Sequence, residues 1–457
     1  MKPLLWFLSI LLICWGGLGS ARASGRAGAR PRASAYWTAE PNQAFAYFGI
    51  SVASAGDVNG DGFEDVIVGS DGYDNGPNSQ GRAFVFHGSA EGLSTKPNWM
   101  AEFDQEFDSY RASVASAGDV NGDGYGDVIF GVSGYSNGQF AEGRARVYQG
   151  SPSGLSSAPD WTTESNQAGA FFGRSVASAG DVNGDGYDDV IVGADGYDGG
   201  LEDEGKVFVF HGSAAGLSRT PNWAAESNQL FAYFGPAVAS AGDVNRDGYD
   251  DVIVGALFYY SADEGKAFVF HGSAGGLSHA PNWKAESNQE NAYFGGSVAS
   301  AGDVNGDGYD DVVVGADSYD SGQIDEGKAF VFHGSAAGLS RSPNWTAEPN
   351  QERAYLGNSV ASAGDVNGDG YDDVIVTGVY DNGQSYEGPF VFDGSPGGLS
   401  RTPNWAGESS GSCVASAGDV NEDGYTDVIV GNPDVDQGQT DEGMAFVFNG
   451  SAGGLAG

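Results

Sequence analysis

Residues 297–317 read SVASAGDVNGDGYDDVVVGAD, and related copies of this stretch give the chain seven repeats in register. Each repeat is marked by a tryptophan, at intervals of 60 or 62 residues: Trp37, Trp99, Trp161, Trp223, Trp283, Trp345 and Trp405. Self-similarity at a fixed period is typical of a protein built from one structural unit that packs against copies of itself. The repeats occupy residues 35–457, which we predict to be one repeat domain.

Each repeat contains four short segments that favour β-strands. In the fifth repeat they are residues 297–301, Asp311–Val314, Ala329–His333 and the segment around Trp345. Gly, Asn, Asp and Pro separate these segments, and no window shows a sustained apolar period of 3.6 residues, so we expect essentially no helix. Seven units of four strands predict an all-β fold, a seven-bladed β-propeller of four-stranded blades.

The composition of the segments predicts where each lies in a blade. Small residues fit the innermost strand, where seven strands converge, and the aromatic segment fits the interior between blades. A linear solenoid is the structural alternative, but its ends need polar caps. The chain stops before an eighth tryptophan segment and begins with one at Trp37. We therefore expect the N-terminal strand to complete the last blade and close the ring, which leaves no open edge.

Every repeat has a nine-residue loop of the form D-V-N-x-D-G-[FY]-x-D after its first predicted strand. Side-chain oxygens at positions 1, 3 and 5, a glycine at 6, a backbone carbonyl at 7 and a carboxylate at 9 are how a short loop surrounds Ca²⁺. The candidate metal ligands are Asp57, Asn59, Asp61, Phe63 and Asp65; Asp119, Asn121, Asp123, Tyr125 and Asp127; Asp181, Asn183, Asp185, Tyr187 and Asp189; Asp243, Asn245, Asp247, Tyr249 and Asp251; Asp303, Asn305, Asp307, Tyr309 and Asp311; Asp365, Asn367, Asp369, Tyr371 and Asp373; and Asp419, Asn421, Asp423, Tyr425 and Asp427.

The alternatives to calcium are weaker. An EF-hand is excluded, because its loop carries Glu at position 12 and lies between helices. A solvated acidic turn explains one copy but not seven complete ones, and Mg²⁺ is disfavoured because cages made almost wholly of protein oxygens suit the larger ion. We expect up to seven structural Ca²⁺ ions. Arg246 and Glu422 replace glycine at position 4, which supplies no ligand, and should leave binding intact.

Two further short motifs recur in register with the loop. They are Phe-Gly before the first strand, at Phe48-Gly49, Phe172-Gly173, Phe234-Gly235 and Phe294-Gly295, and Gly-Ala after the second, at Gly193-Ala194, Gly255-Ala256 and Gly315-Ala316. With the loop, they make the repeat resemble the FG-GAP repeat of the integrin α-subunit N-terminal propeller. The resemblance implies a seven-bladed propeller with structural calcium in the hairpin between a blade's first two strands, on the face opposite the ligand face.

Three repeats depart from this pattern. The second has Tyr110-Arg111 in place of Phe-Gly, and the sixth has Leu356-Gly357. The seventh is six residues shorter between Trp405 and Asp419 and lacks the Phe-Gly motif. We expect the loop of that blade on the face opposite the calcium loops to be shortened.

The chain is strongly acidic, with 62 Asp and Glu against 20 Lys and Arg and a net charge of −42. A polyanion repels phosphate backbones and anionic lipid head groups, so nucleic acid and membrane surfaces are disfavoured as partners. Residues 1–23 have the charged start, apolar middle and Ala-x-Ala end of a secretory signal peptide, and residues 24–34 read as a flexible leader. We expect a secreted or extracellular protein, at the cell surface or in the periplasm of a bacterium, without membrane insertion.

Three classes of function remain open. A binding or adhesion module uses calcium to make a rigid platform for an extracellular protein or a glycan. A calcium-dependent lyase or hydrolase acting on carbohydrate needs one blade with a unique catalytic constellation, and none stands out, so no catalytic residue is predicted. A structural coat or matrix protein is the third class. The fold does not decide between them.

A few other residues have both a plain and a functional interpretation. One repeat position carries His87, His211, His271 and His333, and elsewhere Gln149, Asp393 and Asn449; we interpret these as strand-end polar residues. Cys413 is interpreted as an inert thiol on an inner strand. Only the fourth repeat has a Phe-Tyr-Tyr run, so Tyr259 and Tyr260 are the candidate ligand-binding residues, on the face opposite the calcium loops. The alternative is that these tyrosines only cover the top of their blade.

Overall fold

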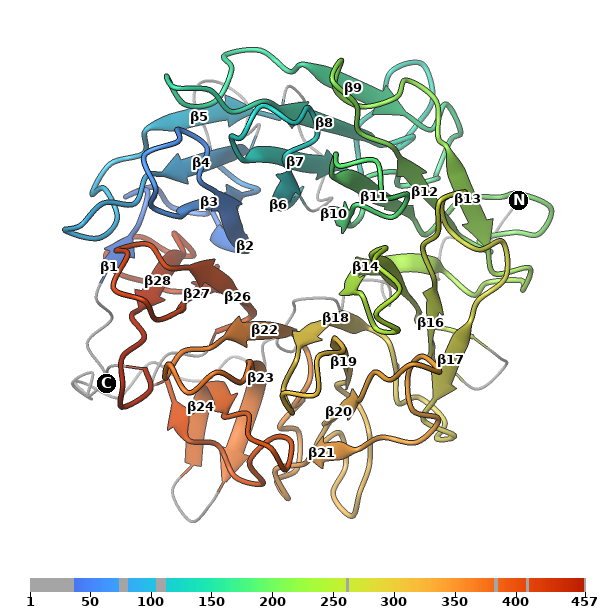
Figure 1. Ribbon diagram of the computed structural model, residues 1–457, viewed down its shortest axis with the longest axis vertical. Helices are drawn as coiled ribbons and strands as arrows, with labels where there is room; N and C mark the ends of the chain where they lie inside the picture. Colours follow the sequence, from blue (N-terminus) through green and yellow to red (C-terminus); the bar gives the residue numbers. More distant parts are fainter. Residues whose placement is uncertain are drawn as a thin grey trace.

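The computed structural model describes residues 37–73, 81–103, 112–259, 263–381, 385–407 and 411–455, without the side chains of residues 379–387. These residues form seven antiparallel four-stranded sheets, arranged as blades around a central axis (Figure 1). The prediction of a seven-bladed β-propeller is confirmed. Within the described ranges there is no helix, and therefore no helix that could cross a membrane.

Every blade has the same order of strands from the axis outward. The innermost strands are β2 (Phe48–Gly56), β6 (Ala112–Gly118), β10 (Val176–Gly180), β14 (Phe234–Gly242), β18 (Ser297–Gly302), β22 (Val360–Gly364) and β26 (Cys413–Gly418). The second strands are β3 (Asp65–Ser70), β7 (Asp127–Val132), β11 (Asp189–Ala194), β15 (Asp251–Ala256), β19 (Asp311–Ala316), β23 (Asp373–Asp381) and β27 (Asp427–Asn432). The third strands are β4 (Arg82–Phe86), β8 (Arg144–Tyr148), β12 (Lys206–Phe210), β16 (Lys266–Phe270), β20 (Lys328–Phe332), β24 (Ser385–Phe392) and β28 (Met444–Phe448). The outermost strands are β5 (Trp99–Glu102), β9 (Trp161–Glu164), β13 (Trp223–Glu226), β17 (Trp283–Glu286), β21 (Trp345–Ala347), β25 (Trp405–Ala406) and β1 (Trp37–Ala39).

The N-terminal strand closes the ring, as predicted. β1 is the outer strand of the last blade, with Trp37 opposite Val447 and Ala39 opposite Ala445. In Figure 1, β1 in blue lies beside β28 in red. The indole nitrogen of Trp37 also donates a hydrogen bond to the carbonyl of Ser94 in the first blade, at 2.9 Å. Tryptophans of five other blades make the same contact to the next repeat.

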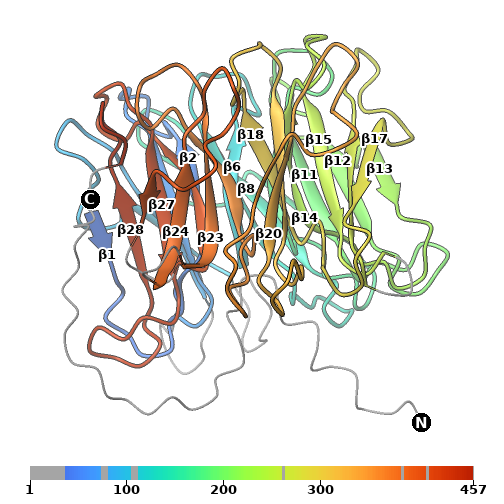
Figure 2. The same ribbon diagram turned by 90° about the horizontal axis from the view of Figure 1, so that it is seen from below.

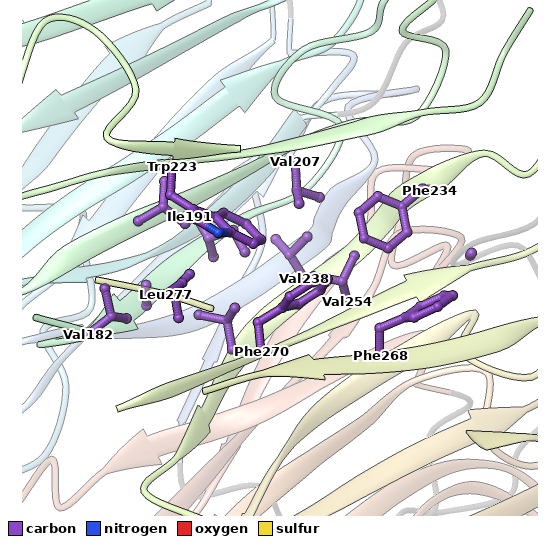
Figure 3. Close-up of a cluster of buried hydrophobic side chains, with 14 residues drawn as sticks. Val182, Ile191, Val207, Trp223, Phe234, Val238, Val254, Phe268, Phe270 and Leu277 are labelled. Carbon is purple, nitrogen blue, oxygen red and sulfur yellow. The ribbon is translucent and has the colours of Figure 1, made fainter. Parts of the chain in front are cut away.

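The hydrophobic core lies between neighbouring blades. In Figure 3, Trp223 of the third blade packs in one buried cluster with Phe234, Phe268 and Phe270 of the fourth. The rings of Trp223 and Phe270 meet edge to face, with centroids 4.9 Å apart, a favoured aromatic geometry. An equivalent cluster occurs at each junction. The prediction that the aromatic third strand fills the space between blades is therefore confirmed.

Antiparallel strands divide the loops between two faces. Figure 2 shows the strands running between loops at the two ends of the propeller. One end, which we call the acidic-loop face, carries the seven Asp-rich loops and the loops that follow the third strands. The other end, the connecting face, carries the loops that follow the second strands and the connections from blade to blade.

Candidate metal centres

The acidic loops are folded by their own aspartates, as the third repeat illustrates. Asp181, at position 1, accepts the amides of Gly184 and Asp185 through Oδ1, at 2.7 and 3.1 Å, and the amide of Gly186 through Oδ2. Asp185, at position 5, accepts the amide of Tyr187 at 3.2 Å. Both carboxylates therefore face the inside of the loop. All seven loops repeat the contacts from the amides of positions 5, 6 and 7.

The carboxylate at position 9 is the buried base of each loop. Asp189 has no exposed surface; its Oδ2 accepts the amide of Val182 at 3.2 Å, and its Oδ1 accepts the amide of Gly212 at 2.8 Å. Burial raises the pKa of this carboxyl to about 7, against the effect of the two amides. Burial also raises the pKa of the position 9 carboxyl in the other six loops. The pKa rises to about 7 for Asp65, Asp127, Asp373 and Asp427. It rises to about 8 for Asp251 and Asp311.

Among the described residues, the guanidinium of Arg246 in the fourth loop lies against Gly308 of the fifth, but it forms no described ion pair with a loop carboxylate. Where the structure describes ion pairs, Lys and Arg pair with acidic residues outside the loops, for example Lys206 with Glu226 and Lys266 with Glu286. The only basic groups that the described ion pairs bring to a loop carboxylate are His271 and His333. Buried carboxylates without a cation are costly, and the raised pKa of the position 9 carboxyl is a consequence of this cost.

The loops offer the donors of a metal site without forming a finished one. Across the described ranges, no three His, Cys, Asp or Glu side chains converge as a preformed metal cluster. Three of the five predicted donors are carboxylates, at positions 1, 5 and 9, and in the third repeat each of them already accepts a backbone amide. The remaining donors are an amide side chain and a backbone carbonyl. Hard oxygen donors of this kind suit Ca²⁺.

The loops are bonded to one another around the ring. The amide at position 8 donates to the position 1 carbonyl of the preceding blade at all seven junctions, for example from Asp188 to Asp119 at 3.2 Å. At four junctions the position 8 carboxylate also accepts the position 1 amide; Asp250 accepts from Asp181 at 2.8 Å. Position 8 is Gly126 in the second repeat and Thr426 in the seventh, so neither supplies a carboxylate. Sequence reasoning missed this role for position 8.

Aromatic residues at position 7 cover the preceding loop. A side chain at Gly60 would place its Cβ 2.4 Å from the ring of Tyr125 in the next blade, which explains a small residue at position 4. Arg246 and Glu422 occupy this position with φ of 58° and 57°. Their loops keep the position 1 contacts, because Asp243 still accepts the amide of Asp247 at 3.0 Å. The loop fold is therefore kept at both positions, and the expectation that Arg246 and Glu422 leave metal binding intact stays a prediction.

The Phe-Gly and Gly-Ala motifs meet at the blade junctions. Phe172 is buried, and the amide of Gly173 donates to the carbonyl of Gly193, the first residue of a Gly-Ala motif, at 2.9 Å. A Cβ on Gly131 would lie 2.1 Å from the carbonyl oxygen of Gly173, so the backbones of neighbouring blades touch here. Leu356 of the sixth repeat is buried in the place of phenylalanine.

The remaining candidate residues lie as follows. Tyr259 is half-buried on the connecting face, with its ring 5.4 Å from that of Phe268 and with Lys266 Nζ 4.9 Å from its centroid. Tyr197 and Tyr319 contact the equivalent phenylalanine and lysine of their own blades. Tyr260, Tyr110 and Arg111 lie outside the described residues, as do residues 1–36. Cys413 is half-buried at the start of β26.

Exposed apolar side chains gather on the connecting face. Large hydrophobic residues with 40–57% of their surface exposed occur there in six places: Phe45, Phe140, Leu201, Leu230, Phe231 and Ile324. A seventh, Met100, lies on the outer strand β5. Leu201 and Phe231 are close, since the amide of Phe231 donates to the carbonyl of Glu202, next to Leu201, at 2.9 Å. This concentration was not predicted from the sequence.

A closed ring of seven four-stranded blades, each with an Asp-rich hairpin loop on one face, defines a seven-bladed β-propeller built from one repeated unit. The model of the FG-GAP repeat matches residues 48–86, 111–148, 172–210, 234–270, 294–332 and 414–448, and that of an FG-GAP-like repeat matches residues 365–430. The chain belongs to the FG-GAP repeat family, so the resemblance seen in the sequence is confirmed.

Similar proteins include integrin alpha subunits. Integrin alpha-5 of Xenopus laevis is 31% identical over 263 residues, which are 56% of this chain and 24% of that protein. Integrin alpha-V of Gallus gallus is 34% identical over 240 residues, 50% of this chain and 22% of that protein. Integrin alpha-IIb of Mus musculus is 33% identical over 221 residues, 46% of this chain and 20% of that protein. The matched part thus spans a quarter or less of these relatives.

Proposed function

We propose that the chain is a secreted, calcium-stabilised propeller that acts as a binding or adhesion module for an extracellular protein or glycan. The ring of acidic loops carries the proposal. Seven loops are bonded to one another around one face, and none of the described ion pairs joins their carboxylates to Lys or Arg. Residues 1–23 are the signal peptide, residues 24–34 a leader and residues 35–457 the propeller.

Calcium is the cation that the loops suit best. Positions 1, 3, 5 and 9 and the carbonyl at position 7 offer five oxygens, and water completes the six to eight that Ca²⁺ takes. Each ion would stabilise carboxylates such as Asp189 as anions, against the burial that raises their pKa. It would also fix position 1, which carries the bonds to the next blade. The role of calcium is therefore structural.

The connecting face is the proposed binding surface. Leu201, Leu230 and Phe231 are exposed there, beside the acidic residues Glu202 and Asp203. Exposed apolar groups edged by charge are typical of interaction sites. Two kinds of ligand match this surface. One is a protein that presents an apolar contact surrounded by basic groups, and the other is a glycan that stacks on aromatic rings. We retain Tyr259 and Tyr260, on the neighbouring loop of the fourth blade, as proposed ligand-binding residues.

Adhesion is favoured over catalysis by two observations. The described blades repeat one another, and none brings a distinct set of nucleophile, acid and base together. The similarity to integrin alpha subunits also supports a binding role. A calcium-dependent enzyme acting on carbohydrate, or a coat or matrix protein, remains the alternative function.

A calcium-controlled binding screen tests the proposal. The secreted chain is applied to glycan and extracellular-protein arrays in Ca²⁺ and, in parallel, in chelator. We expect a ligand that is bound in Ca²⁺ and lost in chelator, together with a lower melting temperature in chelator. Turnover of a polysaccharide, detected as new reducing ends, would instead support the enzyme. Binding and melting that are both unchanged by chelator would refute the calcium-stabilised module.

A further inference from the structure

Five of the seven acidic loops carry an Asn-Gly pair at positions 3 and 4. The asparagines of these pairs are Asn59, Asn121, Asn183, Asn305 and Asn367. The fourth loop has Asn245-Arg246 at these positions, and the seventh has Asn421-Glu422. Asparagine is a labile residue, and a glycine after it leaves the next backbone amide without a side chain to shield it. Position 3 of these five loops is therefore open to reaction with the backbone that follows it.

The reaction of an Asn-Gly pair is deamidation through a cyclic imide. The backbone nitrogen of the glycine attacks Cγ of the asparagine, so that an N–Cγ bond forms and the Cγ–Nδ2 bond breaks. Nδ2 leaves as ammonia and takes the amide proton with it. Water then opens the imide at one of its two carbonyls, which leaves aspartate or isoaspartate. Attack needs the two reacting atoms within about 3–3.5 Å and aligned, so a contact that holds the glycine amide slows the reaction.

The aspartate at position 1 holds the glycine amide in all five of these loops. In the third loop, the amide of Gly184 donates to Oδ1 of Asp181 at 2.7 Å. The same bond, which we call the position 4 contact, is 2.6–2.7 Å long in the other four loops, from Gly60, Gly122, Gly306 and Gly368. The N–H group points at the carboxylate, so the nitrogen cannot turn toward Cγ of the asparagine while this bond is kept.

The two loops without the position 4 contact also lack the glycine. The amide of Arg246 donates instead to the backbone carbonyl of Asp243, at 3.3 Å. In the seventh loop, the described bonds to the Asp419 carboxylate come from positions 5 and 6 and not from Glu422. In both loops a side chain at position 4 shields the amide. The Asn-Gly pair therefore occurs in these loops only where the aspartate at position 1 holds its amide.

We propose that position 3 of the five Asn-Gly loops is a deamidation site, and that calcium bound in the loop protects it. The carboxylate at position 1 and the side-chain oxygen at position 3 are both proposed calcium ligands. An ion that fixes the first keeps the position 4 contact in place, and its bond to the second fixes Cγ. Removal of the ion frees both reacting groups. The inference rests on the proposed binding of calcium by the acidic loops.

Deamidation changes a loop permanently. Aspartate at position 3 adds a negative charge to a loop that already has three carboxylates, and isoaspartate lengthens the backbone by one methylene group. Asn121 and Asn367 accept the amide of position 5 through Oδ1, at 2.9 Å, a contact that depends on the ordinary backbone spacing. A chain kept without calcium therefore loses its loops one by one, and calcium added later does not restore them.

Peptide mapping of the full secreted chain tests the inference. The chain is kept at neutral pH, below its melting temperature, in Ca²⁺ and in chelator, and mass spectrometry follows the conversion of each asparagine. We expect the five asparagines to convert faster in chelator by about tenfold or more, as for the loss of a hydrogen bond to a charged group. Asn245 and Asn421 should stay unconverted. The control is Asn137, an exposed residue before Gly138 on the connecting face, which should convert equally in both.

Two reciprocal variants separate the glycine from the rest of the loop. R246G creates an Asn-Gly pair in the fourth loop, so Asn245 should convert in chelator. G184R copies the fourth loop into the third, and Asn183 should then resist conversion even in chelator. Arg246 already adopts the positive φ of this position, 58°. A melting temperature that still rises with Ca²⁺ shows that each variant folds.

The outcomes separate this inference from the proposed function. Equal conversion in Ca²⁺ and in chelator, with a melting temperature that still rises in Ca²⁺, would overturn the deamidation sites alone. Conversion in chelator of Asn449, a buried residue before Gly450, would mean that the whole chain unfolds, and would overturn protection by single loops. Asn245 that stays unconverted in R246G would also overturn the inference. If calcium changes neither melting nor conversion, the cation role of the loops is refuted altogether.

Discussion

The backbone amide of Glu64 donates a hydrogen bond of 3.3 Å to the carbonyl oxygen of Asp419. Glu64 belongs to the first acidic loop and Asp419 to the last, so this bond completes a ring of seven equivalent bonds between loops. The ends of the propeller therefore meet at two levels: between β1 and β28 at the rim, and between acidic loops nearer the axis. Closure depends on the loop conformation as well as on strand pairing.

Removal of the closing strand should open the ring. Deletion of residues 24–40 removes β1, exposes the edge of β28 and loses the contact of Trp37 with Phe86, whose ring centroids are 4.9 Å apart. Exposed edges pair between chains. We expect aggregation or a loss of cooperative unfolding, measured by light scattering and calorimetry. Deletion of residues 24–33 keeps β1 and should behave like the parent; if the two truncations behave alike, β1 does not close the ring.

Removal of calcium should lower the free energy of unfolding by the binding free energy of several sites. A ligand bound only by the folded state adds about 2.7 kcal/mol per site at 100 times its dissociation constant. We expect chelator to lower the melting temperature steeply, and Asp185→Ala to remove about one site's share while leaving partner binding intact. Glu91→Ala, an exposed carboxylate on the same face, is the matched control. A melting curve that is identical with and without chelator would contradict structural calcium.

The carboxylate at position 8 should couple neighbouring loops. Asp250 accepts the amide of Asp181 at 2.8 Å, and a hydrogen bond to a charged group contributes about 1.5–3 kcal/mol. Asp250→Thr copies the residue that the chain uses at Thr426, and we expect it to destabilise the chain by about that amount in denaturant unfolding. Asp250→Asn keeps an acceptor oxygen and should lose less. Equal losses in the two variants would mean that the contact with Asp181 does not carry the effect.

Carboxyl titration on the connecting face should give a pH dependence that does not involve the acidic loops. Burial raises the pKa of Asp317 to about 7, and the Asp325 carboxylate adds to the shift. A raised pKa in the folded state favours folding at low pH, and this contribution is lost as pH rises through about 7. In saturating Ca²⁺, the stability of Asp317→Asn relative to the parent should rise by about 1 kcal/mol between pH 5 and pH 8.5, after allowance for solvent screening. The control Glu290→Gln changes an exposed carboxyl on the connection from the fourth blade to the fifth and should follow the parent at both pH values.

Features that depend on the residues of a single repeat could be predicted from the sequence. The strands of the fifth blade begin at Ser297, Asp311, Lys328 and Trp345, within one residue of the predicted segments, because strand composition and turn residues are local signals. Ring closure was predictable because β1 has the composition of an outer strand.

Contacts between repeats could not be predicted in the same way. Asp188 reaches Asp119 across 69 residues, and nothing in its own loop distinguishes it from a solvated carboxylate. The neighbours of the histidines could not be predicted from the sequence either. We interpreted His271 as a strand-end polar residue because histidines of different blades are far apart, yet its neighbours are loop residues of its own blade, about 20 positions away. Register within a sheet, rather than sequence pattern, sets that contact.

Partner binding should depend on the connecting face. Tyr259 also packs on Phe268, so Tyr259→Ala/Tyr260→Ala should cost some stability as well as binding, and the binding is measured well below the melting temperature. Leu230→Ser/Phe231→Ser removes exposed groups with little effect on packing, and we expect a loss of affinity of at least tenfold, about 1.4 kcal/mol. Met100→Ser changes an equally exposed apolar residue on the outer strand β5 and should bind like the parent. Full binding by both double variants, or equal weakening by Met100→Ser, would place the partner elsewhere on the propeller.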